Sequence, residues 1–275
     1  MSGLRQELVQ RSITAICLSA VVVALVLFSP NLILNTFVFL LSLALFFEWM
    51  KVSKASRKKK IIFLLLFSSL ICCILGFGAL LEPIPIITML GITVWIVIAF
   101  QIFFREGRLS SSFSFTNFWI GLILISTFCL TCFQFVNGSR LFLLIAIFNV
   151  AIFDSWAYII GKNFGKNSFL PELSPNKTIE GLIGGLASSI VFVTLLYILI
   201  EEVSLKASIA LMLSIPFALC GDYFFSFLKR KANIKDTGSI LPGHGGLLDR
   251  VDSHLAAIPM TAFFSHLLYM LGLYF

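Results

Sequence analysis

Charged side chains are scarce in this sequence. Asp, Glu, Lys and Arg together make up 12% of its 275 residues, whereas hydrophobic residues make up 59%. Soluble globular domains average about a quarter charged and about half apolar residues. This shortage of charge excludes an ordinary soluble domain, and the apolar runs leave no room for a separate one. Lipid is therefore the expected solvent for most of the chain.

Cysteine contributes only six residues, and all of them lie inside apolar runs. Cysteines in such surroundings act as small hydrophobic residues, so we expect no disulfide framework. Cys129 and Cys132 form a C-x-x-C pair, but no second pair and no nearby histidine accompanies them. A zinc or redox site is not expected there either, because such sites need further ligands.

Long apolar runs are what the sequence has in abundance. Nine runs reach about 18 residues or more, which is enough for an α-helix to cross the core of a bilayer. Pro30, Pro83 and Pro85 mark tight turns between neighbouring runs. The predicted fold class is an all-α, polytopic integral membrane protein with about nine transmembrane helices. These helices are expected at residues 12–29, 31–49, 61–81, 84–104, 113–136, 141–160, 179–200, 205–227 and 254–275.

The basic residues predict the topology. With a cytoplasmic N-terminus and alternating spans, 18 of the 20 Lys and Arg residues fall in cytoplasmic segments, and only Arg140 and Lys206 fall outside. Short cytoplasmic loops of membrane proteins collect Lys and Arg in this way. We therefore expect a multi-pass protein of the cell inner membrane or another cytoplasm-facing membrane. The net charge of +7 comes from these short clusters, so no nucleic-acid partner is predicted.

Ionisable residues are unevenly divided along the chain. Residues 1–140 carry almost none inside their predicted spans, apart from Glu48, which lies near a span end and is expected to reach the interface. From Asp154 onward the spans and inner loops are rich in Asp, Lys, Gly, Ser and His. We expect residues 1–140 to form a scaffold and residues 141–275 to form a catalytic region with cytoplasmic loops.

Two clusters open the second half. Asp154 lies within an apolar run, where a costly carboxylate is a functional candidate, although packing against a neighbouring helix is the alternative. The segment 174–178 places Lys177 just before a predicted helix, where capping side chains and free N–H groups favour phosphate. Gly181 and Gly185 follow in a stripe of small residues, for which close helix packing is the expected role.

The third cluster extends from residue 221 to residue 252. On a continuing helix Asp222, Ser226 and Lys229 lie on one face, and Asp249 and Asp252 also share a face if their segment is helical. Carboxylates beside Lys and Arg suit a phosphate ester bound through Mg²⁺, and the glycine-rich run 242–246 suits a triphosphate. A basic loop that touches anionic lipid is the alternative, but it does not explain the aspartates.

This third cluster resembles the signature of phosphatidate cytidylyltransferases, and segments around Asp154 and Lys177 are similar to other common segments of that family. The resemblance covers about residues 150–255. The signature positions are Ser226, Lys229, Arg230, Lys235, Asp236, His244, Gly245, Gly246, Asp249, Arg250 and Asp252.

The resemblance implies an activity in phospholipid biosynthesis. A phosphate oxygen of phosphatidic acid would attack the α-phosphorus of CTP, which gives CDP-diacylglycerol and pyrophosphate. It also implies Mg²⁺ held by Asp222, Asp249 and Asp252, and two-metal chemistry would add a second cation. Lys177, Lys229 and Arg230 would contact phosphates, with Ser226 orienting an oxygen. The remaining expected substrate contacts are Asp154, Lys235, Asp236, His244, Gly245, Gly246 and Arg250.

Three alternatives stay open. A polyprenol kinase or a CDP-archaeol synthase would share parts of this pattern and also use CTP. A secondary transporter would show intramembrane aspartates, but its halves would be alike and its polar residues would lie near the midplane. The small and aromatic residues of the last predicted helix are compatible with a homodimer, which the sequence does not test.

Overall fold

The structure is a computed structural model. It describes residues 19–53, 84–104, 118–171, 174–238 and 245–272, together with single positions between 56 and 68. Several predicted features lie outside the described residues, namely the start of the first span, most of the span at 61–81, and His244.

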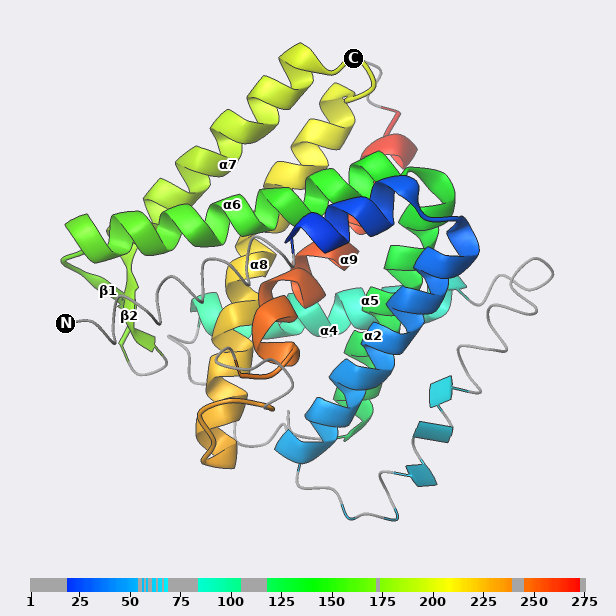
Figure 1. Cartoon of the computed structure of the whole chain (residues 1–275). Coiled ribbons are helices and arrows are strands. Elements are labelled where there is room, and N and C mark those ends of the chain that lie inside the picture. The colour runs from blue at the N-terminus through cyan, green and yellow to red at the C-terminus, as the bar shows by residue number, and fades with distance from the viewer. Residues whose placement is uncertain are drawn as a thin grey trace.

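Helices dominate the described chain, as predicted (Figure 1). A short apolar helix, Ser19–Phe28, comes first. The longer elements follow in the order α2 (Asn31–Val52), α4 (Ile84–Phe104), α5 (Phe118–Gly138), α6 (Arg140–Phe164), β1 (Ser168–Leu170), β2 (Ser174–Thr178), α7 (Ile179–Leu199), α8 (Leu205–Ala232) and α9 (Leu248–Met270).

The protein is an all-α membrane protein, but the count of nine spans is not confirmed. Within the described residues six helices, α2 and α4 to α8, are long and apolar enough to cross a bilayer. The last helix, α9, is less apolar and is largely buried. It begins at Leu248 rather than at residue 254, because the acidic turn before the apolar run is already helical.

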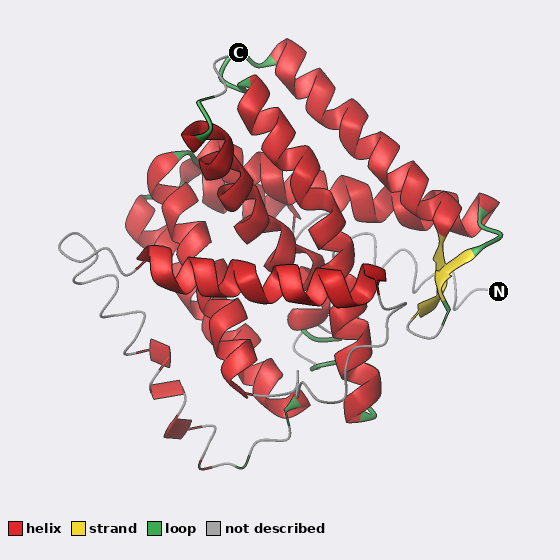
Figure 2. Ribbon diagram, turned by 180° about the vertical axis from the view of Figure 1, so that it is seen from behind, coloured by secondary structure: helices red, strands yellow, loops and turns green. Residues whose placement is uncertain are grey.

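The sequence did not predict the small hairpin between α6 and α7. Its strands β1 and β2 pair antiparallel, with Ser168 opposite Thr178 and Leu170 opposite Ser174. Figure 2 shows this hairpin at one end of the α6–α7 pair. Thr178 ends β2 and also caps α7, since its hydroxyl accepts a hydrogen bond from the Gly181 amide at 3.2 Å. The hairpin thereby fixes the residue before this cap, Lys177.

Glycines allow close contacts between helices at two positions of the C-terminal half. A Cβ at Gly181 would lie 2.6 Å from the Ala157 carbonyl oxygen and 3.0 Å from Gly161 Cα, so α7 approaches α6 through this stripe, as predicted. At Gly221 of α8 a Cβ would collide with the backbone of Asp252 in α9. The second contact brings the acidic turn of α9 against the face of α8 that carries Asp222.

Aromatic side chains join the N-terminal helices to α8. Trp49 of α2 is buried, and its ring centroid lies 6.3 Å from that of Phe224 and 5.9 Å from that of Phe225. Trp95 of α4 meets Phe224 edge to face at 5.7 Å. One hydrophobic core therefore includes residues from both sides of position 140. The boundary between scaffold and catalytic region at that position stays a prediction.

Candidate functional site

Four aspartates and two lysines meet where α6, β2, α8 and α9 come together. Asp154, Asp222 and Asp252 interact electrostatically with one another and with Lys177. Lys229 interacts with Asp222 and Asp252 as well as with its direct partner, Asp249. These six residues, which the sequence places in three separate clusters, form a single site.

The first half of the site is the pair formed by Lys177 and Asp222. The Lys177 ammonium forms an ion pair with Asp222 and lies 4.3 Å from the ring centroid of Tyr223. The hairpin carries Lys177 across to α8 just before the chain turns into α7. The two side chains are 22% and 31% exposed, although the Lys177 nitrogen itself is buried.

The second half is centred on Asp249. Its Oδ1 accepts from the Lys229 ammonium at 2.9 Å. Its Oδ2 accepts from the Thr237 amide at 2.8 Å and the Gly246 amide at 3.0 Å, and the Thr237 hydroxyl oxygen lies 3.0 Å from the same Oδ2. Burial raises the pKa of Asp249, but the lysine and the two amides outweigh it and hold the pKa below its ordinary value. Asp249 is therefore a carboxylate at neutral pH.

Asp154 and Asp252 line the buried side of the site. Asp154 hydrogen-bonds with the Ser253 side chain, which places α6 against the first turns of α9. The Oδ1 of Asp252 accepts from the Ser253 amide at 2.9 Å. Both carboxylates lie within the electrostatic reach of Asp222. The arrangement thus concentrates negative charge in a poorly solvated corner, which is costly without a nearby cation.

The donor set fits a hard divalent cation in kind. Magnesium prefers oxygen ligands, and four carboxylates meet here while two lysines contact them directly. Among the described residues, no three His, Cys, Asp or Glu side chains are placed to hold a metal as they stand. Asp222 and Asp249 each have an oxygen committed to a lysine in this arrangement.

The other predicted residues lie around this centre. Ser226 is half-buried on α8 between Asp222 and Lys229, and α8 continues to Ala232 as the shared face requires. Gly245 has a φ of 79°, and a Cβ there would lie 3.2 Å from both Asp236 Oδ1 and Asp249 Oδ2. Asp236 and Gly245 thus border the site.

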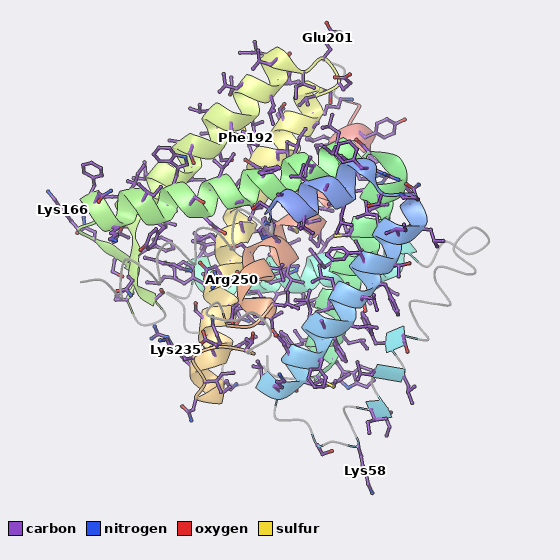
Figure 3. The ribbon with its side chains drawn as sticks, in the orientation of Figure 1. Lys58, Lys166, Phe192, Glu201, Lys235 and Arg250 are labelled. Atoms are coloured by element: carbon purple, nitrogen blue, oxygen red, sulfur yellow. The ribbon has the colours of Figure 1, made fainter. Side chains whose placement is uncertain are left out.

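Three other predicted basic residues lie at the surface. Arg230, Lys235 and Arg250 have exposed side chains. Figure 3 shows Lys235 and Arg250 near the lower part of α8, while Glu201 lies at the opposite, upper end of the molecule. Their positions suit contacts with a ligand at the rim rather than with the buried carboxylates.

Sequence reasoning missed two residues, Glu48 and Thr237. The expectation that Glu48 reaches the interface is wrong, because its side chain is fully buried and bonded to the start of α9. The signal was present, since a carboxylate in an apolar run is a functional candidate by the same argument that singled out Asp154. Thr237 carried no such signal, because a hydroxyl in a polar loop is unremarkable.

The fold and the site together define a polytopic membrane protein with an acid–lysine centre suited to phosphates. The model of the cytidylyltransferase family matches residues 9–268. Because that match covers nearly all of the chain, the protein belongs to the cytidylyltransferase family.

Curated relatives are named phosphatidate cytidylyltransferase. That of Bacillus subtilis (strain 168) is 42% identical over 113 residues, covering 40% of this chain and 42% of the relative. That of Staphylococcus haemolyticus (strain JCSC1435) is 41% identical over 122 residues, covering 43% and 46%. That of Aquifex aeolicus (strain VF5) is 40% identical over 124 residues, covering 44% and 46%. The matches thus span less than half the length of these relatives.

Proposed function

We propose that this protein is a phosphatidate cytidylyltransferase, which converts CTP and phosphatidic acid to CDP-diacylglycerol and pyrophosphate. The observation that carries the proposal is the meeting of Asp154, Asp222, Asp249 and Asp252 with Lys177 and Lys229 at one junction. Membership of the cytidylyltransferase family and the names of the relatives support the same activity.

The reaction needs no protein nucleophile. An oxygen of the phosphatidic acid phosphate forms a bond to the α-phosphorus of CTP, the bond from that phosphorus to the oxygen of the β-phosphate breaks, and pyrophosphate leaves. Catalysis of such transfers consists mainly of positioning and charge neutralisation. A site of fixed carboxylates and ammonium groups meets that requirement, because both substrates are anions whose charges must be brought together.

Lys177 and Lys229 provide the neutralisation. Each ammonium has three donors and a flexible stem, so it can exchange its aspartate partner for a phosphate oxygen. That exchange would leave oxygens of Asp222 and Asp249 available beside Asp252. When bound there, Mg²⁺ supplies polarisation of phosphate oxygens, and Asp222, Asp249 and Asp252 are the residues that would hold it. A second cation would use the same carboxylate-rich corner.

The remaining residues orient the substrates. Ser226 lies on the α8 face between Asp222 and Lys229, where its hydroxyl can direct a phosphate oxygen. Gly245 and Gly246 lie beside Asp249, whose Oδ2 accepts from the Gly246 amide, and this glycine-rich run, with His244 next to it in sequence, suits a triphosphate. Asp236 borders this loop, and its predicted neighbours at the rim are Arg230, Lys235 and Arg250.

We also propose that the site faces the cytoplasm. CTP is a water-soluble nucleotide, and the sorting of basic residues favours a cytoplasmic position for the loop after α8. Phosphatidic acid resides in the bilayer, and its phosphate group would lie at the same depth as the site. In this arrangement CTP would reach Lys177 and Lys229 from water, and phosphatidic acid would reach them from the lipid.

A product assay tests the proposal. Purified protein in phospholipid nanodiscs containing phosphatidic acid is incubated with CTP and Mg²⁺, and lipid products are separated. We expect CDP-diacylglycerol and pyrophosphate in equal amounts, and their loss after chelation with EDTA. Folded protein that forms no CDP-lipid, or that releases CDP as a kinase does, would overturn the proposal.

A further inference from the structure

Glu48 is a fully buried carboxylate that connects α2 to the start of α9. Its Oε1 accepts from the Leu247 amide at 3.0 Å, and its Oε2 accepts from the Leu248 amide at 2.8 Å. The Thr237 hydroxyl lies 2.9 Å from the same Oε2. Three donors that are about 190 to 200 residues away in sequence therefore converge on one side chain.

The two amides belong to the first turn of α9. The first N–H groups of a helix lack partners within it, and Leu247 has no polar side chain with which to cap them. Glu48 supplies the missing acceptors from another helix, and its negative charge suits the positive end of the helix dipole. The position and direction of α9 at Asp249 thus depend on a residue of the N-terminal half.

Thr237 extends this connection to the site. Its hydroxyl contacts both Glu48 Oε2 and Asp249 Oδ2, and its amide also donates to Asp249. Two glycines make the close approach feasible, because a Cβ at Gly238 or Gly246 would collide with Glu48 oxygens or Thr237. The loop between α8 and α9 is therefore held against Glu48 and Asp249 together.

A cap alone does not require this arrangement. Burying a carboxylate is costly, and a neutral hydroxyl or amide would cap a helix without that cost. Only a carboxylate presents two acceptor oxygens to three donors. A glutamine in the same place has one acceptor oxygen, and its NH₂ group would face an N–H or O–H donor.

We propose that Glu48 is a positioning residue for the candidate site. Through Thr237 and the first turn of α9 it fixes the direction of the Asp249 carboxylate relative to Lys229. Being fully buried, it acts through these residues rather than on a substrate. This inference relies on the proposed function for its kinetic consequence, but not for its structural one.

The test compares Glu48→Gln and Thr237→Val with a control, Glu201→Gln, which removes an exposed carboxylate at the opposite end of the molecule. Each protein is measured in nanodiscs for kcat, for the Mg²⁺ concentration at half-maximal rate, and for thermal unfolding. We expect Glu48→Gln to lower kcat or raise the Mg²⁺ requirement about 10- to 100-fold, as loss of a supporting residue does at metal sites. Glu201→Gln should match the wild type.

A double variant separates positioning from simple stabilisation. If Glu48 acts through Thr237, the kinetic loss of Glu48→Gln/Thr237→Val should equal that of the more affected single variant rather than the product of both. A fully multiplicative loss, or a Glu48→Gln protein with wild-type kcat and Mg²⁺ dependence, would overturn the inference. Should Glu48→Gln fail to fold, Thr237→Val is compared with Thr237→Ser. Only Thr237→Ser, which keeps the hydroxyl, should then retain the wild-type kcat and Mg²⁺ dependence.

Hydrogen exchange provides a readout that does not need activity. In Glu48→Gln the amides of Thr237, Leu247 and Leu248 should exchange faster than in the wild type, while those of α6 stay unchanged. Unchanged exchange at all three positions would contradict the inference. If the wild type forms no CDP-lipid but exchange changes as expected, the proposed function fails and the structural role of Glu48 stands.

Discussion

Replacing Asp249 with asparagine tests a carboxylate of the site that accepts several hydrogen bonds. Three donors meet it, namely the Lys229 ammonium at 2.9 Å, the Thr237 amide at 2.8 Å and the Gly246 amide at 3.0 Å. Asparagine keeps one acceptor oxygen and gains an NH₂ group. Because the two amide donors lie on the loop side, the oxygen should stay there and the NH₂ group should face Lys229.

The expected cost follows from that geometry. One charge-assisted hydrogen bond is lost, which costs about 1.5–3 kcal/mol of stability. Little of this is screened, because the Lys229 and Asp249 side chains are only 19% and 7% exposed. Activity should fall further, by about 10²- to 10³-fold in kcat, as when one preorganised electrostatic partner is removed from an active site. The fall in kcat should therefore be larger than the loss of folding stability alone would cause.

The assay measures kcat and KM for CTP at saturating phosphatidic acid, together with thermal unfolding in the same nanodiscs. Glu201→Gln provides a matched loss of one carboxylate far from the site. The reasoning would be refuted if Asp249→Asn unfolded at a lower temperature yet turned over at the wild-type rate. That result would make Asp249 a structural partner of Lys229 without a part in the reaction.

Three further predictions use other parts of the structure. Lys177→Met should destabilise the fold, because it removes a cation that faces Asp154, Asp222 and Asp252. It should also reduce kcat/KM for CTP at least 10-fold in steady-state kinetics, whereas Lys206→Met, at the other end of α8, should not. The folded pKa of Asp249 lies below its ordinary value. Its carboxylate therefore stabilises the fold above about pH 4, and this contribution is lost as pH falls through the folded pKa. The unfolding temperatures of wild type and Asp249→Asn should consequently converge in acid. Gly181→Ala should destabilise the folded protein by about 1–3 kcal/mol through the α6–α7 contact. Gly138→Ala should not, since a Cβ there meets no described atom within 4 Å. Equal unfolding temperatures of the two variants would contradict this packing.

The helices were the most predictable part of the fold, because each apolar run carries its own length signal. The expected helix 179–200 agrees with α7 to within one residue, and 84–104 agrees with α4. The start of α9 was misplaced because Asp249 and Asp252 interrupt the hydropathy pattern, although both are helical and Asp249 lies in the first turn. The β1–β2 hairpin escaped prediction because its strands are only three and five residues long.

The positions of several site residues on their helices were predictable, but the pairing of these residues was not. Helical spacing correctly placed Asp222 and Lys229 on one helix and Asp249 and Asp252 in one turn. Spacing does not reveal that Lys177, 45 positions before Asp222 in the printed sequence, pairs with it, because that contact depends on where the hairpin holds Lys177. The buried role of Glu48 was equally hidden, since it needs the packing of α2 against the start of α9.

The most direct test of the central claim follows the phosphorus atoms of CTP. Wild-type protein in nanodiscs with phosphatidic acid and Mg²⁺ is given CTP labelled on the α-phosphorus in one reaction and on the γ-phosphorus in another. Cytidylyl transfer predicts that the α-label enters the lipid while the γ-label leaves as pyrophosphate. Appearance of the γ-label in the lipid, or of neither label with folded protein, would contradict the account.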